Sequence, residues 1–134
     1  MPRSLLPCAV WVLLLTLAPF AWADSVHGRW QLIEINGEHV EQAPVLVLNH
    51  DGRMWGAASC NGSVGQFEQR GSELAFIDNE MTLLGCRLPP QVAAQHDAFL
   101  RMLVGTVSVR SAEQNLLVLV APDGREMTLR RQPE

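Results

Sequence analysis

Most of the chain after residue 24 consists of short segments in which apolar and polar positions alternate, separated by turn residues. Alternation with a period of two is typical of a strand that buries one face in a core. In the segment Glu73–Ile77, for example, Leu74 and Phe76 alternate with small or polar residues. We therefore predict about eight antiparallel strands. They are Gly28–Ile35, Val45–Leu48, Arg53–Ala57, Ser63–Glu68, Glu73–Ile77, Thr106–Arg110, Leu116–Val120 and Glu126–Arg130, with Met81–Leu84 as a candidate for one more.

Turn signals lie between these predicted strands. The pairs Asn36-Gly37 and Asp123-Gly124 adopt the tight turns of β-hairpins easily, because asparagine, aspartate and glycine tolerate positive φ. The pair Asn61-Gly62 predicts a turn with positive φ for the same reason. Turns this short favour antiparallel neighbours rather than parallel strands joined by long crossovers.

One segment departs from the alternating pattern. Between residues 90 and 104 the apolar positions recur at helical spacing, after Pro89-Pro90 and before Gly105. A single amphipathic helix between strands of an antiparallel sheet can bury its stripe only against the concave face of that sheet. We therefore predict an α+β fold, a curled sheet or open barrel with one helix packed against it. The stripe comprises Val92, His96, Phe99, Leu100 and Leu103, and Gln95, Asp97 and Arg101 lie off it.

The first 23 residues have the pattern of a secretory signal peptide. Met1-Pro2-Arg3 gives a positive start, residues 5–20 are almost wholly apolar, and Ala21-Trp22-Ala23 is a small-x-small cleavage site. We expect cleavage after Ala23 and a single mature domain at residues 24–134, located in the periplasm or outside the cell. The alternative is a retained anchor, because the uncharged run 4–23 is nearly long enough to span a bilayer.

Composition and charge exclude several classes of protein. The formal net charge is −4, so the chain lacks the basic surface that binds nucleic acid, and we expect no nucleic-acid partner. Every basic residue is arginine, which excludes Schiff-base chemistry and a catalytic lysine. We expect a monomer.

Two cysteines remain after cleavage, since Cys8 leaves with the leader. In an exported chain, two well-separated thiols such as Cys60 and Cys86 are expected to form a disulfide. The alternatives are a pair of buried reduced thiols, favoured only in the cytosol, and a redox or metal-binding pair. The redox alternative lacks the usual C-x-x-C spacing.

The sequence contains no recognisable catalytic or metal motif. The spacing of the histidines does not match a metal site, and the scattered methionines suit core gaps better. Asp78 and Glu80 fall in a turn-like stretch and are interpreted as solvated charges. We therefore predict no catalytic residue, no metal site and no cofactor. The histidines are His27, His39, His50 and His96, and the methionines are Met54, Met81, Met102 and Met127.

Two interpretations of the aromatic residues remain open. In the first, Trp30, Trp55, Phe76 and Phe99 line an apolar pocket for a small lipophilic ligand or an acyl chain. In the second, the interior is packed, as large aromatics in small β domains usually are, and the outer surface docks an envelope protein. A small periplasmic inhibitor of a hydrolase would belong to the second class.

A series of motifs runs along the chain: Trp30 with Asn36-Gly37, Gly56, Cys60-Asn61, Gly65, Thr82-x-x-x-Cys86, the helix segment Phe99–Leu103 and the hairpin from Leu117 to Asp123-Gly124. In this order and spacing, the motifs resemble the META domain family, the family of the HslJ-type bacterial heat-shock protein. The resemblance covers roughly residues 26–129 and implies a compact α+β envelope domain, linked to stress response, drug tolerance, motility or secretion, without established enzymatic activity. Asn61, Gly65 and Thr82 are the motif residues that it singles out. The chain departs from the family pattern at Gly62, at Leu83-Leu84 and at His96.

Overall fold

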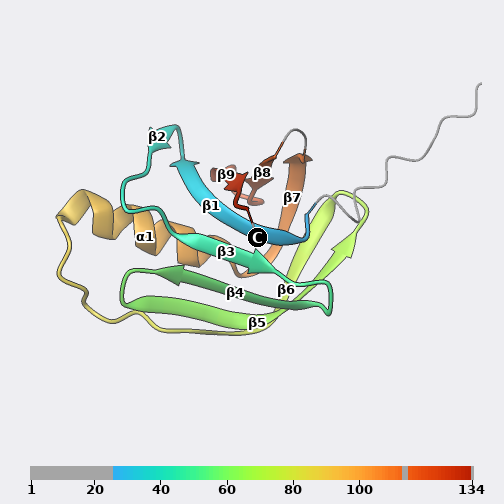
Figure 1. Cartoon of the computed structure of the whole chain (residues 1–134), viewed down its shortest axis with the longest axis horizontal. Helices are drawn as coiled ribbons and strands as arrows, with labels where there is room; N and C mark the ends of the chain where they lie inside the picture. The colour runs from blue at the N-terminus through green and yellow to red at the C-terminus, as the bar shows by residue number, and fades with distance from the viewer. Residues whose placement is uncertain (1–25, 113–114, 134) are drawn as a thin grey trace, which may run out of the picture.

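The computed structural model describes residues 26–112 and 115–133, and the predicted signal peptide lies outside them. The described residues form one antiparallel sheet and one α-helix (Figure 1). The strands are β1 (Gly28–Ile35), β2 (Glu38–His39), β3 (Val45–Leu48), β4 (Arg53–Ala58), β5 (Asn61–Arg70), β6 (Glu73–Met81), β7 (Gly105–Ser111), β8 (Leu116–Val120) and β9 (Glu126–Arg131), and the helix is α1 (Pro90–Met102).

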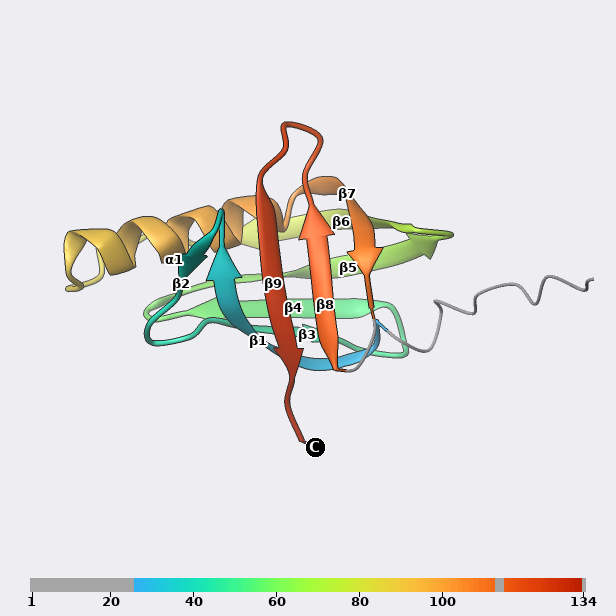
Figure 2. The same cartoon turned by 90° about the horizontal axis from the view of Figure 1, so that it is seen from above.

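The sheet closes on itself to form a barrel. Neighbours pair in the order β2-β1-β3-β4-β5-β6-β7-β8-β9, and β1 also pairs with β9. Figure 2 shows β9 between β1 and β8, where this closure takes place. The ring comprises every strand except the two-residue β2, which forms a short hairpin with the end of β1. The predicted α+β class, with about eight antiparallel strands and one helix, is confirmed.

The alternating positions of the strands fill the barrel interior. Leu32, Leu46 and Leu74 have no exposed surface, and the same holds for Leu117 on β8 and Met127 on β9. Burying each such side chain contributes about 2 kcal/mol relative to leaving it in water. Strand periodicity alone therefore specifies which face of each strand points inward.

Helix α1 packs its apolar stripe against this interior, as predicted. Phe99, Leu100 and Leu103 are at most 1% exposed. Gln95 was expected to lie off the stripe, but it is only 6% exposed. Its Nε2 donates a hydrogen bond to the carbonyl of His39, at 3.0 Å, which satisfies the buried amide and ties α1 to the β1–β2 hairpin.

Gly56 on β4 allows the helix to approach the sheet closely. A Cβ atom at this position would lie 2.6 Å from Leu103 Cδ1 and 3.5 Å from Phe99 Cε1. A side chain there would therefore push α1 outward. The motif glycine at residue 56 has a packing role between sheet and helix.

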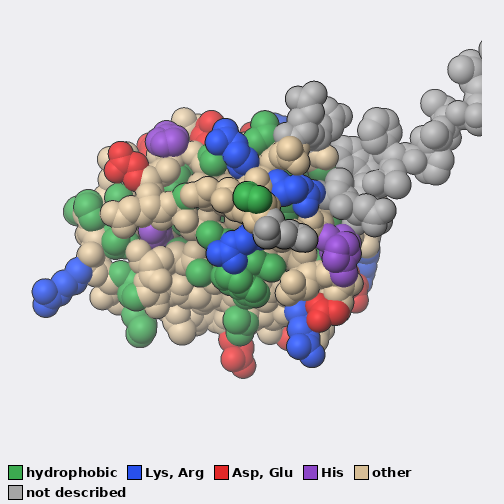
Figure 3. All heavy atoms as spheres, in the orientation of Figure 1, with side chains coloured by type: hydrophobic (Ala, Val, Ile, Leu, Met, Phe, Trp, Pro, Cys, Tyr) green, Lys and Arg blue, Asp and Glu red, His purple; other side chains and the backbone are tan. Residues whose placement is uncertain are grey.

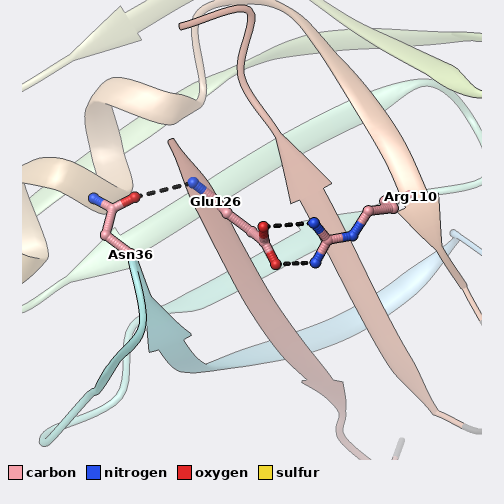
Figure 4. A network of polar contacts seen from close by, with 3 residues as sticks. All are labelled: Asn36, Arg110 and Glu126. Carbon is pink, nitrogen blue, oxygen red and sulfur yellow. Dashed lines mark hydrogen bonds and ion pairs between the residues drawn. The ribbon is translucent and has the colours of Figure 1, made fainter. Parts of the chain in front are cut away.

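The closure of the barrel is reinforced by polar contacts at one end of β9 (Figure 4). Asn36, in the turn after β1, donates its backbone N–H to the Glu126 carbonyl at 2.8 Å. Its Oδ1 accepts the Glu126 N–H at 3.0 Å. The Glu126 carboxylate also forms a two-pronged ion pair with Arg110 of β7, with the Nη1–Oε2 distance at 2.7 Å. Glu126 thus joins β9 to β7 and to the turn after β1.

Two strand predictions were incomplete. β5 and β6 extend further than the hydrophobic pattern indicated, because both continue past the core. Met81–Leu84 is not a separate strand, since Met81 is the last residue of β6. Strand β2 was missed because neither of its two residues is buried, so it carries no periodic signal.

Candidate functional site

The predicted disulfide between Cys60 and Cys86 is present, with the two Cα atoms 5.9 Å apart. Cys60 lies in the turn between β4 and β5, and Cys86 lies in residues 82–89, the connection from β6 to α1 that we call the strap. In the chain-entropy model, closing a loop of 26 residues stabilises the fold by about 3.5 kcal/mol. The bridge fixes the middle of the strap to the end of the barrel.

Asn61 holds the strap by imitating a backbone peptide group. Its Nδ2 donates to the Leu84 carbonyl at 2.9 Å, and its Oδ1 accepts the Leu84 N–H at 2.6 Å. Nδ2 also lies 3.3 Å from Cys86 Sγ. One side chain therefore makes both hydrogen bonds that a neighbouring strand would supply.

Thr82 provides a further connection. The Gly62 N–H donates to Thr82 Oγ1, and the Thr82 N–H donates to the Gly62 carbonyl, both at 3.0 Å. The hydroxyl thus satisfies a nearby backbone group. Thr82, Leu84 and Cys86 are all fixed to the start of β5.

The predicted turn at Asn61-Gly62 was wrong. The residue with positive φ in the β4–β5 connection is Ser59, at 56°, and Asn61 and Gly62 already belong to β5. Asparagine at residue 61 is needed for its side-chain amide rather than for a left-handed backbone.

The third motif residue, Gly65, makes room for Asn79. A Cβ atom on Gly65 would lie 2.9 Å from Asn79 Cα and would overlap the side-chain amide. The Asn79 side chain occupies this space, and its Nδ2 donates to the Leu103 carbonyl, just after α1, at 2.5 Å. Asn79 Oδ1 is buried without a hydrogen-bond partner among the described residues. Gly65 and Asn79 together link β5, β6 and the end of the helix.

The four aromatic residues predicted as pocket lining are not brought together. Trp30, Phe76 and Phe99 are at most 7% exposed and belong to the core cluster. Trp55 is half-buried between the buried residues Met54 and Gly56, so its side chain lies on the outer face of β4. The Arg29 guanidinium lies over the Trp55 ring, 5.4 Å from its centroid.

A surface hollow of about 220 Å³ lies between the strap and the N-terminal half of α1. Its lining is mostly apolar and includes Leu84, Leu88 and Ala93. His96 also lines it, is 4% exposed, and has a buried Nδ1 without a hydrogen-bond partner among the described residues. The His96 Nε2 lies 3.4 Å from the Glu41 carbonyl.

The strap presents two leucines to solvent. Leu83 and Leu84 are 50% and 65% exposed, and Val64 on the adjacent β5 is 55% exposed. Together these residues account for three of the five exposed large hydrophobics within residues 26–112 and 115–133. Figure 3 shows one face of the molecule, on which apolar side chains gather over β3, β4 and β5.

The other polar residues form no clustered site within the part of the chain that the structure describes. No group of three or more histidine, cysteine, aspartate or glutamate residues could hold a metal ion there. His27 stacks on His50, with ring centroids 4.4 Å apart. Asp78 and Glu80 lie on exposed positions of β6 rather than in a loop. Within residues 26–112 and 115–133, no helix has the length and hydropathy needed to cross a membrane.

The sequence model of the META domain family matches residues 23–134. The chain belongs to the META domain family. No curated protein matches this META domain. A solved structure described as the NMR structure of the protein from Burkholderia xenovorans is 20% identical, with a TM-score of 0.66, and the match covers 87% of this chain and 90% of the other. A second NMR structure is 23% identical, with a TM-score of 0.64 over 78% of this chain and 88% of the other.

At these identities the two solved structures support the fold of this META domain alone. Within the domain, the motif residues Asn61 and Thr82 fix the strap to the start of β5, whereas Gly65 makes room for Asn79, which is hydrogen-bonded to the end of α1. Sequence reasoning missed Asn79 and Leu84, the partners that give these motif residues their roles. Neither residue carries a local signal, because each contact joins segments that are distant in the sequence, 23 positions apart for Asn61 and Leu84.

Proposed function

We propose that this META domain protein is an exported, non-catalytic binding protein of the cell envelope that docks a partner protein through its strap. The observation that carries the proposal is the rigid display of Leu83 and Leu84, which are at least half exposed on a segment held by a disulfide and by side-chain hydrogen bonds. A preorganised apolar surface loses little conformational entropy on binding.

The roles of the motif residues support a non-catalytic function. Cys60 and Cys86 are joined to each other, so neither provides a thiolate nucleophile. The Asn61 amide and the Thr82 hydroxyl are engaged with backbone groups of the same barrel end. These polar groups therefore serve the architecture of the strap.

Carriage of a lipophilic ligand is the weaker alternative. Trp30 and Phe99 occupy the barrel interior, where a carrier of this shape would hold its cargo. The hollow between the strap and α1, at about 220 Å³, lies below the range of about 300 to 1,000 Å³ typical of drug-sized ligand sites, and a second hollow beside Thr82, at about 340 Å³, reaches only the lower end of that range. Hollows of this size fit one or two side chains of a docked protein better than an acyl chain.

Three further points extend the proposal. The predicted leader and the Cys60–Cys86 bridge both suit an oxidising compartment such as the periplasm. Inhibition of an envelope hydrolase is one specific form of the function, because a rigid apolar loop can enter a cleft at low entropic cost. A role in envelope stress fits the family resemblance.

Site-specific photo-crosslinking in the producing cell tests the proposal. A photoreactive residue at position 84 should yield a discrete protein adduct, whereas the same residue at Leu116, an exposed leucine on β8, should not. The protein captured in the adduct, once purified, should bind the oxidised wild-type chain. It should not bind the Leu84→Asp variant of that chain. A lipid adduct at position 84 would favour the carrier alternative. Equal labelling at both positions, or none, would contradict the proposal.

A further inference from the structure

Strand β6 has two halves with different neighbours. Its first half pairs with β7, in a register that runs from Glu73 opposite Ser108 to Phe76 opposite Gly105. At Asp78 the backbone adopts positive φ, at 52°, and the pairing with β5 shifts register. Beyond this bend, β6 continues along β5, and no strand among the described residues pairs with its other edge.

The hydrogen bonds of Thr82 determine which backbone groups lie on that unpaired edge. The Thr82 N–H points toward β5, because it donates to the Gly62 carbonyl at 3.0 Å. Backbone groups alternate in direction along an antiparallel strand, so those of Met81 and Leu83 point away from β5. Within the described part of the chain, the Leu83 backbone has no hydrogen-bond partner.

The unpaired edge is held in an extended form before any partner arrives. Asn61 fixes Leu84, Gly62 fixes Thr82, and the disulfide fixes Cys86. Unpaired edges of this kind are templates for strand addition unless a protein protects them. No proline or lysine protects residues 78–84.

The chemistry around the edge is both acidic and apolar. Asp78 and Glu80 are the only charged residues in the segment 78–84, both are exposed, and neither forms an ion pair with a described residue. A hollow of about 340 Å³ lies beside them, lined by Gly62, Val64, Glu80, Met81 and Thr82. A complementary segment would carry basic side chains next to apolar ones.

We propose that the edge of β6 and the strap, at Met81 and Leu83, binds an extended basic segment of the partner protein as an added β-strand. The inference rests on the proposed docking function and specifies its mode. Backbone hydrogen bonds to Met81 and Leu83 supply affinity, an apolar side chain enters the hollow beside Val64, and arginine or lysine pairs with Glu80 or Asp78. Recognition of alternate side chains gives the selectivity.

A second copy of this chain is a poorer occupant of the same edge. Pairing two such edges would bring the Asp78 and Glu80 carboxylates of one copy close to those of the other. Like charges on neighbouring strands are destabilising, so the acidic edge disfavours self-association and favours a basic partner.

Synthetic peptides test the inference on the oxidised mature chain. The probe is a short peptide in which arginine alternates with valine, with serine at each end. The matched controls replace arginine with glutamate, or methylate the central backbone nitrogen. We expect the arginine peptide to bind, to slow hydrogen exchange of the Met81 and Leu83 amides, and to bind at least about tenfold more tightly than either control.

The variant Leu83→Pro removes one edge N–H without breaking a hydrogen bond of the folded chain, and proline is tolerated on edges. Leu83→Ala is its control, because it keeps the N–H and shortens the same side chain. We expect proline to weaken peptide binding about tenfold more than alanine does, with both variants folded by circular dichroism. Glu80→Gln should weaken binding of the arginine peptide. It should not weaken binding of the glutamate peptide, because that peptide gains nothing from the Glu80 carboxylate.

The results separate the binding mode from the docking function. Equal binding of the arginine and glutamate peptides, unchanged exchange at Met81 and Leu83, or equal affinities of the proline and alanine variants would overturn strand addition. If a protein adduct at position 84 still forms in cells, the partner docks at the strap by a mode other than strand addition. If that adduct is also absent, the docking function itself fails. A dimer of the free chain that the arginine peptide does not dissociate would assign the edge to self-association.

Discussion

The side-chain amide of Asn61 lies against the backbone of Leu84 and makes both of the hydrogen bonds that a paired strand would make, at 2.9 and 2.6 Å. The two residues are separated by 23 positions in the sequence. Because the contact is made by a side chain, Leu84 is fixed to the start of β5 although the strap is not part of a strand. This geometry leaves the side chain of Leu84 exposed.

Asn61→Ala should release the strap without unfolding the barrel. Loss of two hydrogen bonds, one of them beside the disulfide, is expected to lower the free energy of unfolding by about 1 to 2 kcal/mol. Urea denaturation measures this loss, and amide exchange at Leu84 should rise. The matched control is Asn49→Ala, since the hydrogen bonds of Asn49 to other described residues involve its backbone alone. Equal stabilities of the two variants would show that the Asn61 amide does not hold the strap.

Gly65→Ala should be strongly destabilising, by about 2 kcal/mol or more, because the new Cβ overlaps Asn79. In the double variant with Asn79→Ala, the loss should be less than the sum of the two single losses, since the overlap with the amide is gone. Gly85→Ala is the control, because nothing lies within 4 Å of a Cβ there. Additive losses measured by thermal unfolding would contradict the steric explanation.

Gly56→Ala tests the contact between β4 and α1. The added Cβ would lie 2.6 Å from Leu103 Cδ1, so the leucine side chain must move and the helix shifts with it. We expect a loss of about 1 to 3 kcal/mol in the free energy of unfolding. Leu103→Ala in the same background should recover part of this loss. No recovery in a double-mutant cycle would place the clash elsewhere.

Reduction of the Cys60–Cys86 bridge should lower the free energy of unfolding by about 3.5 kcal/mol. Urea denaturation with and without reductant measures the effect, and the Cys60→Ser, Cys86→Ser double variant should match the reduced protein. The exported protein should show no thiol labelling unless reductant is added. Free thiols in unreduced exported material would argue against the bridge in the cell.

The barrel and its helix could be predicted because each strand and the helix carry their own periodic pattern. Leu74 and Phe76 alternate inward on β6, and Phe99 and Leu103 recur on one helix face, so local sequence specifies which side is buried. Gln95 was assigned wrongly, because its burial depends on the His39 carbonyl, which only the packed structure supplies. The disulfide was predictable from the two cysteines that follow the predicted leader.

The arrangement of the site was much less accessible to sequence reasoning. Asn61 was identified as a motif residue, but its pair Leu84 looked like any apolar residue before the structure placed the two together. Trp55 was grouped with the core aromatics, yet it lies on the outer face because the alternation of β4 buries Met54 and Gly56 instead.

The sequence by itself determined the antiparallel strands, the single helix and its buried stripe, and the two cysteines available for a bridge. These follow from periodicity and composition, which are local properties of the chain. Only the tertiary structure decided that β1 pairs with β9 to close the barrel and that β6 leaves β7 at Asp78. It also showed that the motif residues hold a strap with two exposed leucines. Such features depend on contacts between distant segments, whose geometry is set by the packing of the whole barrel.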